Sequence, residues 1–139
     1  MEIIIKPFEE KELEQVKELL MECFPEIGTP SIKFHEEKKH FTLLAKEENT
    51  IIGHARIDEL YDNISNESYY LLNYFCVKKA YQNKGIGSKL LNYIIEMAQK
   101  NNISYIELTS KKERQSAHHL YLKNNFYLRE TCVFRKIID

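Results

Sequence analysis

Residues 68–109 contain the pattern that most restricts how this chain can fold. The run SYYLLNYFCV predicts a strand over residues 68–77, and a turn that contains two glycines leads into a long helix over residues 85–100. A second strand is expected over residues 103–109. A strand, a helix and a strand in this order form a βαβ crossover, so we expect the two strands to be parallel and right-handedly connected.

The remaining sequence predicts a mixed sheet with helices on both faces. Helices are expected over residues 9–24, 30–40 and 115–124, and further strands over residues 2–6, 41–46, 51–60 and 126–138. The strands before the long helix form a meander and should therefore be antiparallel. A chain of 139 residues is long enough for one core. We therefore expect a single α/β domain over residues 1–139.

The turn before the long helix is a candidate anion site. Gly85 and Gly87 lie where the chain enters the helix, and the first turn of a helix carries N–H groups without intrahelical partners and the positive end of the helix dipole. Glycines allow a phosphate to approach that backbone closely. A tight turn without any ligand explains two glycines equally well.

Two common nucleotide-binding motifs do not fit this turn. A dinucleotide-binding fingerprint requires a third glycine three residues after Gly87, where the sequence has Leu90. A Walker A loop requires Gly-Lys followed by Ser or Thr, and the chain contains no such run. If a phosphate binds here, it belongs to another kind of ligand.

The charge distribution favours a small anionic ligand over a polyanion. The net charge is −1, which argues against a general nucleic-acid binder. Lys78, Lys79, Lys84 and Lys89 nevertheless follow one another with no acidic residue between them. This local basic field suits one anionic ligand, although a solvated lysine-rich loop is equally consistent with it. No apolar run approaches the roughly 20 residues of a membrane span.

The three cysteines indicate reduced thiols rather than disulfides or a metal site. Cys23, Cys76 and Cys132 are odd in number, widely spaced and flanked by apolar residues. We therefore expect buried thiols in a cytoplasmic protein. The five histidines add no ligand spacing, so no metal is expected. Cys76 has no acid–base partner nearby in the sequence, and we expect it to be a core residue rather than a nucleophile.

Two segments resemble motifs of the GNAT superfamily of N-acyltransferases. YFCVKKAYQNKGIGSKLL is similar to the acyl-CoA-binding motif of that family, because Gln82, Gly85 and Gly87 match its core Gln/Arg-x-x-Gly-x-Gly/Ala and Val77 lies five residues before Gln82. SAHHLYLKNNF is similar to a second motif. Its matching residues are Ala117, Leu120, Tyr121 and Phe126.

The second motif also contains two less common features. Arg114 stands where many members have Asn, and the spelling Arg-x-x-Ala-His is similar to a bacterial subgroup. Asn125 replaces the glycine of the family before Phe126. That position commonly needs a left-handed backbone, which Asn tolerates better than other non-glycine residues. We therefore expect the turn to be kept.

The resemblance implies that acetyl-CoA is the co-substrate. The two parallel strands would splay apart, and the pantetheine arm would run along Phe75, Cys76 and Val77, where a backbone N–H could polarise the thioester carbonyl. The pyrophosphate would lie on the turn and the helix start. The residues expected there are Gln82, Asn83, Lys84, Gly85, Ile86, Gly87 and Ser88, and the second motif adds Arg114, Ala117 and Tyr121.

The implied chemistry is direct attack of an amine on the thioester carbon. Tyr121 matches the tyrosine that serves as the family's acid, and its phenol could protonate the departing thiolate; Tyr121 could equally be a core residue on one face of its helix. The base is less defined. The candidates are Glu67, Tyr74, His54 and His118.

Several functional alternatives stay open at the level of sequence. The acceptor could be a small-molecule amine or a peptide amine, entering beside residues 24–40, and a homodimer is compatible with the resemblance. A non-catalytic acyl-CoA-binding or sensor module on the same fold would bind CoA without turnover. A nucleic-acid-binding domain is supported only by the lysines and would show salt-dependent binding; we expect neither nucleic acid nor membrane as a partner.

Overall fold

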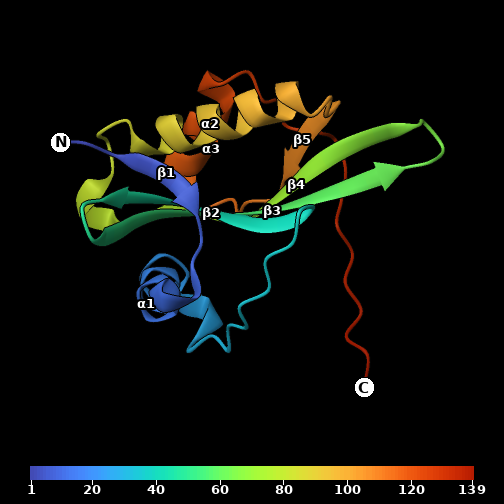
Figure 1. Cartoon of the computed structure of the whole chain (residues 1–139). Coiled ribbons are helices and arrows are strands. Elements are labelled where there is room, and N and C mark those ends of the chain that lie inside the picture. The colour runs from blue at the N-terminus through green and yellow to red at the C-terminus, as the bar shows by residue number, and fades with distance from the viewer. The chain divides into compact units, whose positions relative to one another are not determined.

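The computed structural model describes every residue from Met1 to Asp139. Residues 1–109 form one compact unit and residues 110–139 form a second. The first unit contains a five-stranded sheet in which the strands follow one another in chain order (Figure 1). These strands are β1 (Ile4–Pro7), β2 (His40–Glu47), β3 (Thr50–Asp62), β4 (Glu67–Val77) and β5 (Tyr105–Leu108).

The sheet has the mixed character that the sequence predicts. β1 through β4 pair with their neighbours in antiparallel fashion, whereas β4 and β5 are parallel. Between these two strands the chain passes through α2 (Ile86–Lys100). The expected βαβ crossover is therefore confirmed, and with it the α/β fold class.

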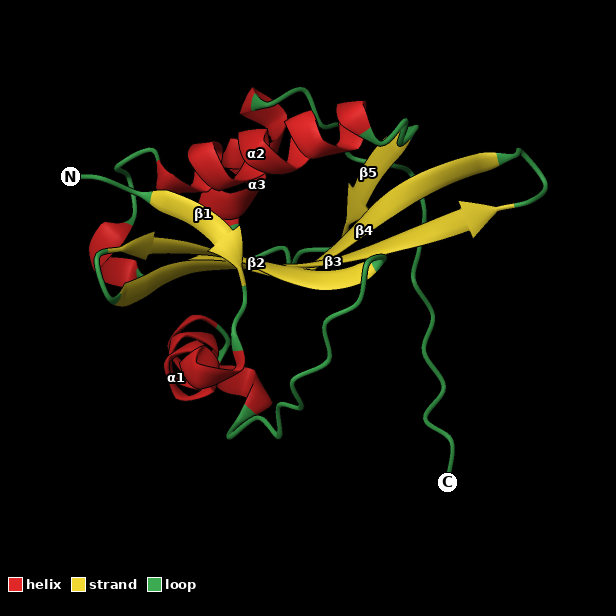
Figure 2. Cartoon of the chain, viewed as in Figure 1, coloured by secondary structure: helices red, strands yellow, loops and turns green.

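Helices cover both faces of the sheet (Figure 2). α1 (Leu13–Cys23) follows a single 3₁₀ turn at Glu10–Glu12, where Glu9 and Glu12 form a reciprocal capping box that satisfies backbone donors at the helix start. α1 lies on one face and α2 on the other. Each face thus buries its own apolar cluster.

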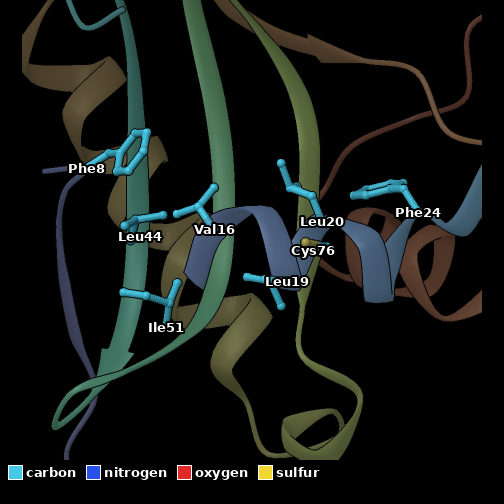
Figure 3. Packing of buried hydrophobic residues seen from close by; sticks show 8 residues of the cluster. All are labelled: Phe8, Val16, Leu19, Leu20, Phe24, Leu44, Ile51 and Cys76. Carbon is cyan, nitrogen blue, oxygen red and sulfur yellow. The ribbon is translucent and has the colours of Figure 1, made fainter. Parts of the chain in front are cut away.

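The cluster under α1 anchors the sheet to the helix (Figure 3). Side chains spaced three or four residues apart on α1 pack against one residue each of β2, β3 and β4, as expected of an amphipathic helix on a sheet. Each such side chain stabilises the fold by roughly 1.5–3 kcal/mol when fully buried. The buried members are Phe8, Val16, Leu19, Leu20, Phe24, Leu44, Ile51 and Cys76.

The helix expected over residues 30–40 is wrong. Apart from one bridge between Glu37 and His40, the chain from residue 28 to 39 has no regular structure. Ile32 and Phe34, which are two positions apart, both pack against the α1 cluster. Side chains two positions apart share a side in extended backbone, whereas a helix aligns residues three or four apart. This extended segment, residues 28–39, is called the strap below.

The second unit is built around α3 (Gln115–Lys123). Asn124 ends the helix, and Asn125 has a φ of +68°. The left-handed turn expected at Asn125 is therefore confirmed. The Tyr121 side chain is buried, and its ring lies 5.8 Å from that of Phe126, centroid to centroid.

The strands expected over residues 126–138 are not formed. A strand needs a hydrogen-bonded neighbour, and residues 110–139 contain no strand that could pair with this segment. Its large apolar side chains are instead exposed. These are Tyr127, Leu128, Val133, Phe134, Ile137 and Ile138. Cys132 is exposed as well, which corrects the expectation of a buried thiol at that position.

Candidate active site

β4 is paired on both sides along its first half only. β5 pairs with it from Tyr69, opposite Tyr105, to Leu72, opposite Leu108. From Asn73 to Val77 the strand continues beside β3, with Val77 opposite Gly53. The parallel pair therefore ends five residues before β4 does. The early end of this ladder agrees with the splayed strands that the family resemblance implies.

A β-bulge lies at the point where the two halves of β4 meet. Arg56 pairs with Asn73 and His54 pairs with Cys76, so Tyr74 and Phe75 together oppose the single residue Ala55. Tyr74 has a φ of +51°. A non-glycine residue in this region costs roughly 1–2 kcal/mol, and bulges occur preferentially next to active sites. Sequence analysis did not predict this bulge.

His54 contacts the bulge from β3. Its side chain is buried, and its Nδ1 lies 2.7 Å from the carbonyl oxygen of Tyr74. Because a carbonyl oxygen can only accept, Nδ1 carries the proton and donates it. Burial lowers the pKa of His54 to about 4; the Tyr74 carbonyl opposes this shift and the charge of Arg56 adds to it. The imidazole is therefore neutral at physiological pH.

The turn after β4 is fixed by two side chains. The Gln82 amide donates to the Val77 carbonyl oxygen at 3.1 Å, which explains why Gln follows Val after five positions. Glu22, at the end of α1, accepts the backbone N–H of Lys79 at 2.8 Å and the Lys78 ammonium at 3.4 Å. The Lys79 N–H holds the pKa of Glu22 below its usual value. These contacts tie the turn to α1.

The start of α2 has the conformation expected of an anion site. Asn83 and Gly85 both have positive φ, +62° and +80° respectively. Gly85 is the N-cap residue, and no side chain caps the helix. An added Cβ at Gly85 would meet no atom within 4 Å, so glycine is required here by backbone conformation rather than by space. The first-turn N–H groups are those of Ile86, Gly87 and Ser88.

Lysine and tyrosine side chains border this helix start. The Lys84 ammonium lies 5.4 Å from the centroid of the Tyr81 ring, within cation–π range. The Tyr81 hydroxyl donates to the Glu47 carboxylate at 3.0 Å, and this hydrogen bond raises the pKa of Tyr81. Lys84 thus adds positive charge next to the uncapped turn.

The structure brings together only part of the predicted site. Phe75 belongs to the bulge and Cys76 and Val77 follow it, and residues 82–88 form the turn and helix start in the same unit. Arg114, which precedes α3, and Ala117 and Tyr121, which lie on it, belong to the second unit. The roles assigned to all of these residues stay predictions.

The four candidate bases occupy different parts of the molecule. Tyr74 and His54 meet at the bulge. Glu67 begins β4, seven residues before Tyr74, which corresponds to roughly 20 Å of extended strand. His118 lies on α3 in the second unit. The structure therefore places two of the four, Tyr74 and His54, beside the predicted acyl position.

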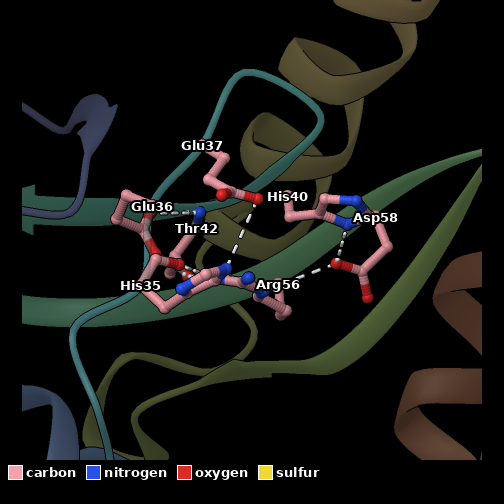
Figure 4. Close-up of polar contacts among 7 residues, drawn as sticks. All are labelled: His35, Glu36, Glu37, His40, Thr42, Arg56 and Asp58. Atoms are coloured by element: carbon pink, nitrogen blue, oxygen red, sulfur yellow. Dashed lines mark hydrogen bonds and ion pairs between the residues drawn. The ribbon is translucent and has the colours of Figure 1, made fainter.

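A polar cluster that sequence analysis missed fastens the strap to the sheet (Figure 4). The Glu36 carboxylate accepts the Thr42 N–H at 2.6 Å and the Arg56 guanidinium at 2.7 Å. Arg56 also donates to the His35 carbonyl oxygen at 2.9 Å. Asp58 lies 3.6 Å from Arg56 Nε and 3.1 Å from His40 Nδ1. The spacing of these residues does not predict the polar cluster, because the sequence predicts a helix for the strap.

The thiols do not form a nucleophilic site. Cys76 is a buried member of the α1 cluster, as the sequence predicts, and the Cys23 thiol donates to the Val77 carbonyl oxygen at 3.5 Å. No three His, Cys, Asp or Glu side chains gather closely enough to hold a metal ion. None of the helices has the length and apolar character needed to cross a bilayer.

Comparison with known proteins places these features in a family. The model of the acetyltransferase (GNAT) family matches residues 13–126. Streptothricin acetyltransferase A of Bacillus subtilis (strain 168) is 30% identical over 97 residues, which are 70% of this chain and 53% of that protein. The chain therefore spans about half the length of this curated relative.

Solved structures share the fold at lower identity. A transcriptional regulator from Bacillus halodurans C-125 superimposes with a TM-score of 0.86 at 19% identity, covering 98% of this chain and all of that one. An aminoglycoside acetyltransferase from an uncultured soil metagenomic sample gives a TM-score of 0.81 at 20% identity, covering 99% of this chain and 97% of that one. These likenesses concern the fold alone.

Proposed function

Because the chain belongs to the acetyltransferase (GNAT) family, we propose that it transfers the acetyl group of acetyl-CoA to a primary amine of a small molecule or a peptide. The observation that carries the proposal is the end of β4. There the β5 ladder stops, a bulge follows, and the turn leads into an uncapped helix start. The three features adjoin one another along a single stretch of chain.

The residues at this position fit acetyl-CoA. N–H groups in the first turn of α2 and the positive end of its dipole suit a pyrophosphate. Gly85 leaves the approach to that turn open, and Lys84 adds charge. The backbone of Phe75, Cys76 and Val77 lies beyond the end of the β5 ladder and would receive the pantetheine arm.

The proposed reaction involves no covalent bond between the protein and its substrates. After a base has taken the ammonium proton, the amine nitrogen attacks the thioester carbon and a carbon–nitrogen bond forms. The carbon–sulfur bond breaks, the nitrogen gives up a further proton to become an amide nitrogen, and the sulfur leaves as a thiolate that takes up a proton. A backbone N–H next to the bulge would stabilise negative charge on the thioester oxygen. Tyr121 is the proposed donor of the proton to sulfur.

Titration of the protein with acetyl-CoA tests binding at the helix start. Gly85→Ala should weaken acetyl-CoA binding by about tenfold or more, because a Cβ strains the left-handed conformation that presents the first-turn N–H groups. Gly28→Ala is the matched control: Gly28 also has positive φ and open surroundings, but it lies after α1. Equal weakening by both substitutions would contradict the proposed site.

Turnover is tested by mixing acetyl-CoA with a panel of amines and measuring the free thiol released. Streptothricin belongs in the panel because the curated relative is named for acetylating it, together with other small-molecule amines and peptides. Tyr121→Phe should lower kcat by about 100-fold and leave acetyl-CoA affinity unchanged, as expected for loss of a general acid. Unchanged turnover in this variant would remove Tyr121 from the mechanism.

Binding without turnover on any amine would favour the alternative function, a non-catalytic acyl-CoA sensor. Absence of acetyl-CoA binding would contradict both functions together. The measurement of turnover on the amine panel therefore distinguishes the two functions once acetyl-CoA binding has been observed.

A further inference from the structure

One side chain from the neighbouring strand, His54, forms a hydrogen bond with the bulge in β4. Tyr74 is held at a φ of +51°, a conformation that a tyrosine rarely adopts. The Nδ1–H of His54 donates to the carbonyl oxygen of this same residue at 2.7 Å. The contact joins β3 to β4 at the step where the regular ladder is interrupted.

The hydrogen bond from His54 constrains the direction of the Tyr74 carbonyl group, and with it the backbone conformation at the bulge. A regular ladder would bring Tyr74 to negative φ and turn its carbonyl group elsewhere. The imidazole of His54 is 5% exposed, so water cannot readily replace it as the donor. A strained backbone conformation persists only where surrounding groups over-determine it. His54 is the group that the structure provides for this purpose.

We propose that His54 is a positioning residue for acetyl transfer: by donating to the Tyr74 carbonyl oxygen it holds the bulge that directs the backbone of Phe75–Val77 toward the acyl group. This inference rests on the proposed function. The proposed role is to orient reacting groups, so loss of the His54 hydrogen bond should change kcat. The turn at residues 82–88, which would bind the pyrophosphate, is fixed separately by Gln82 and Glu22.

The same geometry argues against His54 as the catalytic base. Its Nδ1 proton is engaged with a carbonyl oxygen. Its pKa of about 4, lowered mainly by burial, makes the remaining ring nitrogen a weak base at neutral pH. His54 therefore acts through the bulge rather than on the substrate.

Three variants separate positioning from general destabilisation. His54→Asn places an amide N–H where Nδ1–H lies and should keep kcat within about threefold of the unsubstituted protein. His54→Leu removes the donor and should lower kcat by about 10–100-fold, with acetyl-CoA affinity changed by less than about threefold, as expected when reacting groups are displaced by about 1 Å. Tyr70→Phe is the matched control.

The control removes a partly buried hydrogen bond from the regular half of β4. The Tyr70 hydroxyl accepts from the Asn101 amide at 3.0 Å. Tyr70→Phe should lower the melting temperature without changing kcat. If His54→Leu and Tyr70→Phe lose kcat equally, or if His54→Asn loses as much as His54→Leu, the positioning role is overturned.

Nuclear magnetic resonance gives a readout that needs no activity. Nitrogen-15 shifts of His54 should show the tautomer protonated at Nδ1, and the protein with intact His54 should retain it after acetyl-CoA is added. The tautomer protonated at Nε2 would overturn the inference even if no variant at His54 folds. Absence of acetyl-CoA binding or turnover in the unsubstituted protein is a different result, because it contradicts the proposed function itself.

Discussion

The two halves of β4 differ in strand pairing and in backbone conformation although they belong to one strand. Residues 69–72 pair with strands on both sides, whereas residues 73–77 contain a bulge and extend past the β5 ladder. Tyr70 and Leu72 in the first half are buried in regular conformation. Tyr74 in the second half has positive φ and is 47% exposed.

Within the eleven residues of β4, regular pairing on both sides is thus followed by the irregular segment that the proposed function uses. Regular pairing and burial in the first half contribute to the free energy of folding. The second half gives up regular pairing and directs its backbone toward the proposed acetyl-CoA site. The regular half therefore holds the irregular half in place, and substitutions in the two halves should affect different quantities.

The largest expected effect on stability concerns His54 and pH. Its pKa is about 4 in the folded protein and about 6.5 when unfolded, so the unfolded chain binds more protons between these values. The stabilisation is complete above pH 6.5 and is lost as the pH falls toward 4, by about 3 kcal/mol in total. Denaturant unfolding from pH 7 to 4.5 checks this.

His54→Asn serves as the reference for that titration. Carboxylates with lowered pKa, such as Glu12 and Asp62, also destabilise the protein in acid, but they do so mainly below their ordinary values near 4.5 and 3.8. The variant should therefore show a flatter dependence between pH 6.5 and 4.5. Identical pH profiles would contradict a neutral buried His54.

A glycine substitution in each half should give unequal losses of stability. Tyr69→Gly removes the stacked contact with Tyr105, whose ring centroid lies 4.8 Å away, and places a flexible residue in a paired strand. It should lower the free energy of unfolding by about 2 kcal/mol. Tyr74→Gly loses the edge contact with Phe24 but relieves the strain of positive φ. Its net effect should be near zero, within about 0.5 kcal/mol.

Urea unfolding of both variants under identical conditions measures this contrast. A loss of about 2 kcal/mol in Tyr74→Gly as well would show that its conformation carries no strain. The two halves would then be energetically alike.

The smallest expected effect concerns the strap, which is fastened beside the boundary between the two halves. Glu36 contacts Arg56, and Arg56 is opposite Asn73, the last residue before the bulge. Glu36→Gln weakens a charge-assisted hydrogen bond and should lower the free energy of unfolding by about 1 kcal/mol. Glu37→Gln, at an exposed neighbour, should change it by less than about 0.5 kcal/mol. Equal effects would mean that the Glu36 contact does not fasten the strap.

Local patterns predicted much of the fold. The crossover from β4 through α2 to β5 follows from a strand, a glycine turn and a helix in order, and its bounds agree within two residues. Asn125 was expected to be left-handed from its place after a helix, and it is. Such features depend on residues that are close together in the sequence, so one sequence is enough to predict them.

The errors arise where distant contacts decide the structure. Helix-forming residues in the strap predict a helix, but Ile32 and Phe34 pack on the α1 cluster in extended form. The apolar run at residues 126–138 predicts strands. A strand forms only beside a hydrogen-bonded neighbouring strand, and composition does not show whether one is present. The sequence does not predict the bulge either, because nothing in it indicates a positive φ at Tyr74 and the contacting His54 is twenty residues away.

Backbone amide shifts during an acetyl-CoA titration test the central claim most directly. Amides of residues 75–77 and 85–88 should shift and saturate together, while those of residues 69–72 should remain within about a fifth of that change, because hydrogen-bonded core strands move little on binding. Equal shifts along the whole of β4, or shifts confined to residues 69–72, would contradict the division of labour between its two halves.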